Sequence, residues 1–414
     1  MSSFGARCSA MLLAVGLVMT TASQLRVSAF PIGPGELLLV GWCVLSLVHS
    51  GDLERGQPVR GGIVSLLCTF WASAFALLSI GAVHGMLVGH IELSAALHDA
   101  FAFVFCAGVA IQMARSFNAR DAVLRAARYL PVVAAALLAL LLVLALVVRQ
   151  IGPVKFWYGG IRFSGWAENP NQLALLLVAL PFLALQVRAD SSSNRTRAVY
   201  ASIAGVIAVI GIVTLSDALI VSWLLGAALV GSGAWFHAVF GRSARRSTIL
   251  VYGILCPIML LAILIPFVGG LEGAALDALS GIYSEGGQGS VRLTIWGNGV
   301  EAILQSPFYG LGPGPHSGLH SPNEGFEAHN TLVDWSASAG LLGLLAYIAL
   351  LVVVAVAAVR GRKPFLLVSI VALCCFSLFH YVLRQPLFWG YLVVVLAYAG
   401  VDLVPLQRAK QVAA

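Results

Sequence analysis

Long apolar segments recur along the whole of this chain, and they constrain its fold more than any other feature of the sequence. A helix that crosses a bilayer needs ~20 consecutive, mainly apolar residues. About 12 such windows can be placed, at 8–25, 31–49, 61–83, 97–114, 129–148, 171–187, 199–215, 218–240, 248–268, 331–359, 365–382 and 386–404. Only 10% of the residues are charged, whereas a soluble domain carries about 25%. We therefore predict an all-α integral membrane protein in which residues 1–414 form a single polytopic membrane domain.

The first apolar segment is open to a second interpretation. Arg7, an apolar run from Met11 to Met19 and the small residues from Thr20 to Ser23 resemble a secretory signal peptide. We favour a retained first helix, because the distribution of basic residues among the loops is consistent with it.

The Lys and Arg residues are divided unequally between the two sides of this predicted domain. With the N-terminus in the cytoplasm and the spans alternating, most of the 24 fall in cytoplasmic loops, which is the distribution that orients membrane proteins. The six on the outer side are Arg26, Arg149, Lys155, Arg162, Arg292 and Arg384. The sequence thus predicts cytoplasmic N- and C-termini. It also explains the net charge of +7 by topology and by contact with membrane lipids, so we predict no nucleic-acid partner.

Two outer segments, 149–171 and 269–328, are long enough to be functional in their own right. Within the second, apolar residues recur at a spacing that predicts one face of a short helix over 290–305. Ser306-Pro307 ends that helix, and the glycines and prolines between 310 and 315 predict a turn-rich stretch.

Three of the outer arginines, Arg162, Arg292 and Arg384, lie among Gly, Asn, aromatic and Pro residues. The positive-inside bias disfavours arginine on this side, so their presence there asks for a reason. A guanidinium matches the oxygens of a phosphate group in geometry and charge. We therefore predict that they form a cationic pocket for a diphosphate at the membrane surface.

The long outer segment also contains His316, His320 and His329. Neither the histidines nor the seven cysteines have the spacing of metal ligands, so we predict no metal ion and no other cofactor. A neutral histidine beside a bound diphosphate can act as a general base toward a sugar hydroxyl. On spacing alone, His329 is equally compatible with a role in capping a helix.

Three sequence blocks between about residues 150 and 400 follow one another in a known order. The first ends in Glu168-Asn169-Pro170-Asn171 and has the form G-x-x-x-N-P-N. The second has the form R-x-x-x-W, then P-x-x-G-x-G-x-G, and runs from Arg292 to Gly314. The third, His329-Asn330 followed nine residues later by Gly340-Leu341-Leu342-Gly343, fits H-[N/S/Q]-x9-G-x-x-G. Together the blocks resemble the O-antigen ligase (lipid A-core surface polymer ligase) family and, more loosely, its superfamily of O-antigen ligases and polymerases.

The resemblance implies an all-helical fold of the GT-C type with short helices in a long periplasmic loop. It implies a metal-independent, inverting glycosyltransferase in the inner membrane of a Gram-negative bacterium. The enzyme would transfer a glycan from undecaprenyl diphosphate to lipid A-core on the periplasmic face, as the last step of lipopolysaccharide assembly. Arg292 and His329 match the essential arginine and histidine of the family. We predict that the diphosphate or substrate also contacts Arg162, Arg384, Asn171, Asn330 and His316.

One departure from the family affects the phosphate site. Many relatives have Ser-Arg in a turn where this chain has Ser216-Asp217. Without that arginine, Arg162 or Arg384 becomes more important. The main alternative function is an O-antigen or exopolysaccharide polymerase that uses the same lipid-linked donor. A transporter for a lipid-linked sugar is less favoured, because the predicted spans contain few charges along a central path. A protein O-oligosaccharyltransferase usually has a further C-terminal soluble region, which this sequence does not show.

Overall fold

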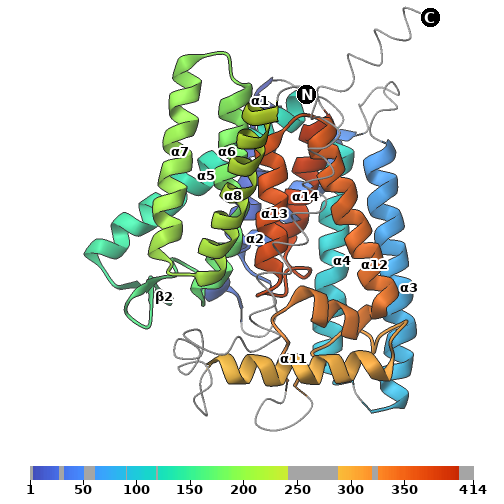
Figure 1. Cartoon of the computed structure of the whole chain (residues 1–414). Coiled ribbons are helices and arrows are strands. Elements are labelled where there is room, and N and C mark those ends of the chain that lie inside the picture. Colours follow the sequence, from blue (N-terminus) through green and yellow to red (C-terminus); the bar gives the residue numbers. More distant parts are fainter. Residues whose placement is uncertain are drawn as a thin grey trace, which may run out of the picture.

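The computed structural model describes residues 3–27, 32–50, 61–89, 91–117, 120–240, 288–318 and 325–400, and it is mostly helical (Figure 1). Its long helices are α1 (Ser3–Met19), α2 (Pro34–Ser50), α3 (Gly61–Leu87), α4 (Leu93–Ser116), α5 (Arg120–Val147), α6 (Pro170–Asp190), α7 (Asn194–Val213), α8 (Asp217–Phe240), α11 (Gln288–Gln305), α12 (Thr331–Arg360), α13 (Pro364–Ser377) and α14 (Pro386–Gly400). In the described part of the chain, six of these, α3 to α7 and α12, are long and apolar enough to cross a membrane.

The prediction of a mainly helical, multi-pass membrane protein is confirmed by these helices. The described parts of α1, α2, α8, α13 and α14 are shorter but also apolar. The predicted span 248–268 lies outside the described residues. The total of about 12 spans and the GT-C type of fold therefore remain predictions.

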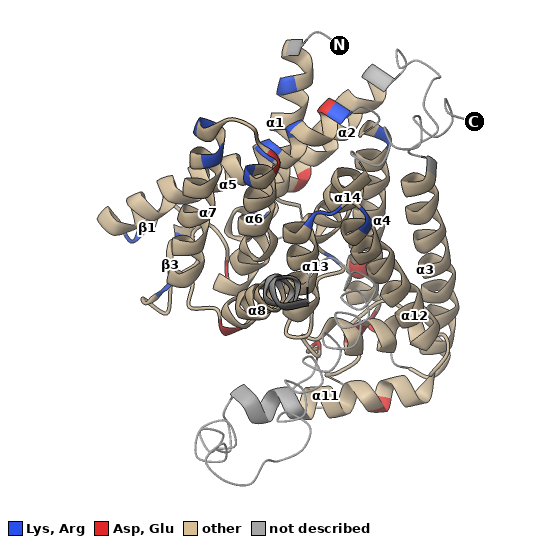
Figure 2. Cartoon of the chain, turned by 45° about the horizontal axis from the view of Figure 1, so that its top comes forward, with Lys and Arg blue, Asp and Glu red and all other residues tan. Residues whose placement is uncertain are grey.

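From α1 to α8, and again from α12 to α14, successive long helices run in opposite directions, so their connections gather at two ends of the bundle (Figure 1). Helix α11 lies across one end, which we call the α11 end. Hydrogen bonds tie the connections at this end together: the Gln24 side-chain amide, after α1, donates to the carbonyls of Lys155 and Ala167, before α6. Figure 2 shows many of the Lys and Arg residues at the opposite end, where the N-terminus lies. This arrangement agrees with the predicted alternation of the spans, while the orientation in the membrane stays a prediction.

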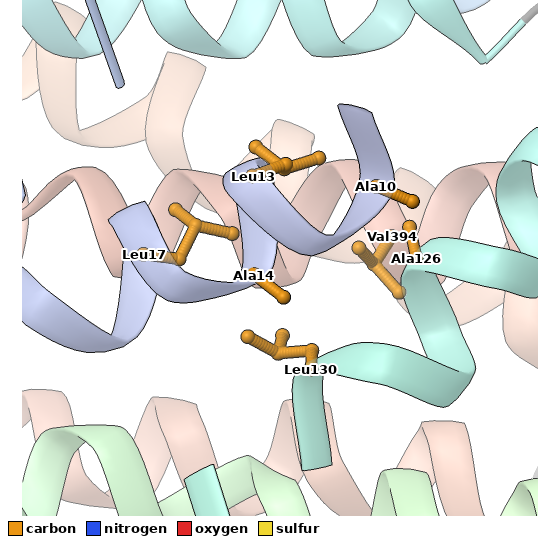
Figure 3. A pocket seen from close by; sticks show the side chains of 7 residues that line it. All are labelled: Ala10, Leu13, Ala14, Leu17, Ala126, Leu130 and Val394. Carbon is orange, nitrogen blue, oxygen red and sulfur yellow. The ribbon is translucent and has the colours of Figure 1, made fainter. Parts of the chain in front are cut away.

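Apolar side chains of α1, α5 and α14 come together around a pocket (Figure 3). Leu13 and Leu17 of α1, Leu130 of α5 and Val394 of α14 line it, with alanines at positions 10, 14 and 126. Helices in lipid associate through such close van der Waals packing, because lipid tails are as apolar as the side chains that they replace.

An aromatic cluster at the centre of the bundle anchors α12. Trp335 of α12 lies against Phe70 of α3 and Phe103 of α4, and Trp71 of α3 lies 4.5 Å from Trp389 of α14 between ring centroids. All five side chains are buried. Because large buried rings resist displacement, this cluster fixes the N-terminal third of α12, which belongs to the third sequence block.

Helix α12 is interrupted at Gly340, which has φ +69° and ψ 179°. The turn-rich segment that follows α11 fills the interruption: the Leu341 N–H donates to the Pro307 carbonyl at 2.8 Å, and the Leu311 N–H donates to the Ala337 carbonyl at 2.8 Å. Backbone outside regular helices is tolerated at membrane depth only where protein groups satisfy its hydrogen bonds. The glycine-rich second block and the first glycine of the third block therefore form one structural unit.

The segment 149–171 differs from the all-helical prediction, because it contains two small antiparallel hairpins. Strands β1 (Gln150–Ile151) and β2 (Val154–Lys155) form the first, and β3 (Trp157–Tyr158) and β4 (Arg162–Phe163) form the second. Glycines with positive φ make the turns, a conformation that costs glycine little. The predicted helix over 290–305 is confirmed as α11, which begins two residues earlier at Gln288.

Candidate active site

His329 lies in a strained turn at the N-terminus of α12. Its φ is +52°, in the left-handed region that residues with a Cβ rarely adopt, and the residue is exposed at the α11 end. The capping role belongs to its neighbour: the Asn330 side chain accepts hydrogen bonds from the N–H groups of Leu332 and Val333. A strained, exposed histidine beside a helix N-terminus is placed to meet an anionic substrate.

Two helices hold the peptide that precedes His329. The buried carboxylate of Asp334, in the first turn of α12, accepts from the N–H of Ala328 at 2.7 Å and from the N–H of Asn330 at 3.1 Å. From α11, the indole N–H of Trp296 donates to the Ala328 carbonyl at 2.8 Å. The turn is therefore fixed by side chains from both the second and the third sequence blocks.

Arg292 lies in the N-terminal half of α11, one helical turn before Trp296. Because Trp296 reaches the carbonyl next to His329, this turn of α11 lies close to the candidate base. Further along the helix, the Asn298 side-chain amide donates to the Ser317 carbonyl at 3.0 Å. These two contacts hold α11 across the end of the bundle, as Figure 1 shows.

Arg384, in the α13–α14 connection, is engaged by two carboxylates. Its guanidinium pairs with Asp99 of α4 and with Glu327, two residues before His329. Although burial opposes its charge, the carboxylates of Glu327 and Asp99 raise the pKa of Arg384 above the ordinary value. The guanidinium also lies over the Tyr381 ring. Its diphosphate-binding role stays a prediction, but the observed partners give it a structural role in holding the segment that leads to His329.

His316 is buried, and its Nε2 lies 2.8 Å from the carbonyl oxygen of Gly312. It therefore packs within the glycine-rich segment that fills the interruption of α12. Its predicted contact with substrate is not tested by this position, and His320 lies outside the described residues.

Arg162, in β4, reaches the turn between α7 and α8, which contains Ser216-Asp217. Its Nε donates to the carbonyl of Thr214 at 3.1 Å, and a terminal nitrogen donates to the Asn171 side-chain carbonyl at 3.2 Å. The Ser216 hydroxyl donates to the same Asn171 oxygen at 2.9 Å. Among the described residues, Arg162 makes no ion pair, whereas Arg384 makes two. A guanidinium with only neutral partners is better placed to bind an added anion.

Five of the predicted site residues fall into two groups, both at the α11 end. His329, Asn330 and Arg384 lie around the start of α12, and Arg162 and Asn171 lie around the start of α6. The start of α12 is joined to the α13–α14 connection by the Thr331 hydroxyl, which donates to the His380 carbonyl at 2.6 Å. Within the described residues, no group of His, Cys, Asp and Glu is arranged to hold a metal ion.

Sequence reasoning missed the carboxylates of this region. Asp99 and Glu327 pair with Arg384 across long stretches of sequence, and no local pattern indicates this. Asp334 did leave a signal, because it is an acidic residue in the first turn of an otherwise apolar helix, five positions after His329. Such a residue at a helix start commonly accepts from backbone N–H groups.

Fold and site together define a multi-pass, helical membrane protein whose candidate polar site lies at one end of the bundle. Residues 193–348 match the family model described as O-antigen ligase, a range that contains Arg292, His329 and Gly340. This match supports membership of the O-antigen ligase superfamily, as the resemblance of the second and third sequence blocks predicted. It supports a transferase role of the O-antigen ligase/polymerase kind. No curated protein sequence matches the chain.

Proposed function

We propose that this protein is an O-antigen ligase, which transfers a glycan from undecaprenyl diphosphate to the lipid A-core oligosaccharide. The reaction would take place at the α11 end, on the periplasmic face of a Gram-negative inner membrane. The observation that carries this proposal is the geometry of His329: an exposed imidazole on a strained turn, held by a helix that carries Arg292. The cytoplasmic position of both termini follows from the distribution of basic residues.

In the proposed reaction, a hydroxyl oxygen of the acceptor sugar attacks the anomeric carbon of the donor glycan. The new bond forms on the face opposite the bond to the diphosphate, which breaks, so the anomeric configuration is inverted. His329 takes the proton from the acceptor hydroxyl, and the diphosphate leaves as an anion on its lipid. The alternative role of His329, orienting the diphosphate, requires the same position. Neither role needs a metal ion, because fixed guanidinium groups can stabilise the departing charge.

Two arginines are proposed to meet that charge. Arg292, on α11, is the first, by analogy with the essential arginine of the family. Arg162 is the second, because its guanidinium lies against the Thr214 carbonyl at the α7–α8 turn, next to the position where many relatives have an arginine. In this chain Arg162 would therefore supply, from the β3–β4 hairpin, the cation that Asp217 does not supply from the turn.

The Arg162→Gln variant tests whether Arg162 supplies the positive charge that the α7–α8 turn of this chain lacks. The amide keeps a hydrogen-bond donor but removes the positive charge, so we expect glycan transfer to fall by about 10- to 100-fold. The measurement is the initial rate of transfer by purified protein over a range of donor concentrations. Lys155→Gln, which removes an exposed charge from the neighbouring hairpin, is the matched control. Equal rates for the two variants would remove Arg162 from the proposed site.

The Arg292→Ala variant tests the enzymatic function itself. In membranes that contain both the lipid-linked glycan and rough lipopolysaccharide, we expect the wild type to produce a glycan ladder on lipopolysaccharide by gel shift. Arg292→Ala should lose this ladder while it inserts in normal amounts. Arg149→Ala, the matched control, removes an exposed cation from the C-terminal side of α5 and should keep the ladder. An unchanged ladder from Arg292→Ala would contradict the assigned role.

A further inference from the structure

One buried carboxylate at the site has no part in the proposed chemistry. Asp334 uses its two oxygens separately: Oδ1 accepts from the N–H of Ala328, and Oδ2 accepts from the N–H of Asn330. The two hydrogen bonds therefore hold the backbone on both sides of His329. The helix start does not need them, because the Asn330 side chain already accepts from the N–H groups of the first turn. Their effect is on the turn that carries His329.

A second helix holds the same peptide from the other direction. The Trp296 indole donates to the carbonyl of Ala328, whereas Asp334 accepts from its N–H. The Trp296 side chain is partly buried and Asp334 is 5% exposed, so both hydrogen bonds are shielded from competing water. Together, Asp334 and Trp296 clamp the residue before His329 between α12 and α11.

Such a clamp has a physical purpose at this position. A residue with a Cβ in the left-handed region is strained by about 1–3 kcal/mol, and it stays there only when the surrounding structure determines it. The direction in which the exposed His329 imidazole leaves the chain is set by this backbone. If the turn relaxed, the imidazole would move away from the acceptor hydroxyl.

We propose that Asp334 and Trp296 are positioning residues, which hold His329 in the orientation needed for proton transfer and couple that orientation to the placement of α11. The inference rests on the proposed function. Neither side chain needs to touch the substrate. Because Arg292 lies one turn before Trp296, the same clamp sets the spacing between the candidate base and the candidate diphosphate ligand.

The first test is Asp334→Asn. An asparagine has one carbonyl oxygen, so one of the two backbone N–H groups would face an amide that cannot accept. Misplacement of a catalytic group by about 1 Å can cost about 100-fold, and we expect turnover to fall by about 10- to 100-fold in correctly inserted, monodisperse protein. Glu301→Gln, the same chemical change at an exposed position of α11, should leave turnover unchanged.

The Trp296→Phe variant is a second test of the clamp, and it does not require that the Asp334→Asn variant folds. It removes the hydrogen bond to Ala328 and keeps an aromatic ring, and turnover should again fall. In a His329→Ala background, neither substitution should lower the residual rate further, because residues that act through one group are not additive. A general structural role would instead lower the residual rate in that background as well.

The glycan-transfer activity of the wild-type protein distinguishes a failure of this inference from a failure of the proposed function. If wild type transfers glycan and both Asp334→Asn and Trp296→Phe turn over like Glu301→Gln, the clamp has no role in positioning. A further loss in the His329→Ala background would also overturn it. If wild type transfers no glycan to any acceptor, the proposed function fails first, and with it the inference.

Discussion

Replacement of His329 by alanine is expected to lower the rate of glycan transfer by about 100- to 10,000-fold, the usual contribution of a general base. His329 is exposed, so the variant should insert and remain monodisperse. The measurement is single-turnover transfer by purified protein, with donor binding followed separately.

A matched control for this variant is His84→Ala, which removes a histidine from the last turn of α3 at the same end of the bundle. Its transfer rate should equal that of wild type. If His329→Ala keeps more than about a tenth of the wild-type rate, general-base catalysis by this residue is excluded. If His329→Ala lowers the affinity for the donor and leaves turnover unchanged, His329 binds the diphosphate and does not act as the base.

The Gly340→Ala variant is expected to be destabilised by several kcal/mol, since a strained backbone conformation and overpacking each cost about 1–3 kcal/mol. The conformation of Gly340, φ +69° and ψ 179°, is one that only glycine adopts readily. An added Cβ would overlap the backbone of Phe308, in the segment that fills the interruption of α12. The turn-rich segment and the helix could then no longer keep the hydrogen bonds that join them.

The yield of monodisperse protein and its thermal unfolding in detergent measure this effect. Gly297→Ala in α11 is the control, because no atom lies within 4 Å of an added Cβ there. Within a helix, alanine is favoured over glycine by about 0.5–1 kcal/mol, so the control should be at least as stable as wild type. Equal stability of the two variants would show that the interruption at Gly340 does not hold the second block in place.

The sequence predicted the helices well because each one is encoded by its own apolar segment. The predicted span over 129–148, for example, matches the second part of α5 (Arg120–Val147) to within one residue at its end, and the short helix over 290–305 appears as α11. Ends were less certain: α13 ends at Ser377, earlier than the apolar segment that continues to 382. The chain leaves the helix there because residues 378–385 turn toward the start of α12, where the Val382 N–H donates to the Thr331 hydroxyl.

The site could be predicted only where one segment carries the information. The third block places His329 and Asn330 at one helix start and Gly340 within the same helix, and the structure has them there. In contrast, Arg162 and Arg384 could not be told apart from sequence. Their roles depend on which segments meet: Arg384 reaches Asp99, 285 positions away, through the packing of α14 on α4. Arg162 reaches the α7–α8 turn through the β3–β4 hairpin.

The most direct test of the central claim uses purified protein, a polyprenyl-diphosphate glycan and EDTA, with and without rough lipopolysaccharide. The account predicts that glycan appears on lipopolysaccharide only when this acceptor is present, and that EDTA does not reduce the yield. Lengthening of the lipid-linked glycan in the absence of lipopolysaccharide would contradict the account. It would show that the protein is a polymerase and that the His329 block marks the superfamily and not the ligase branch.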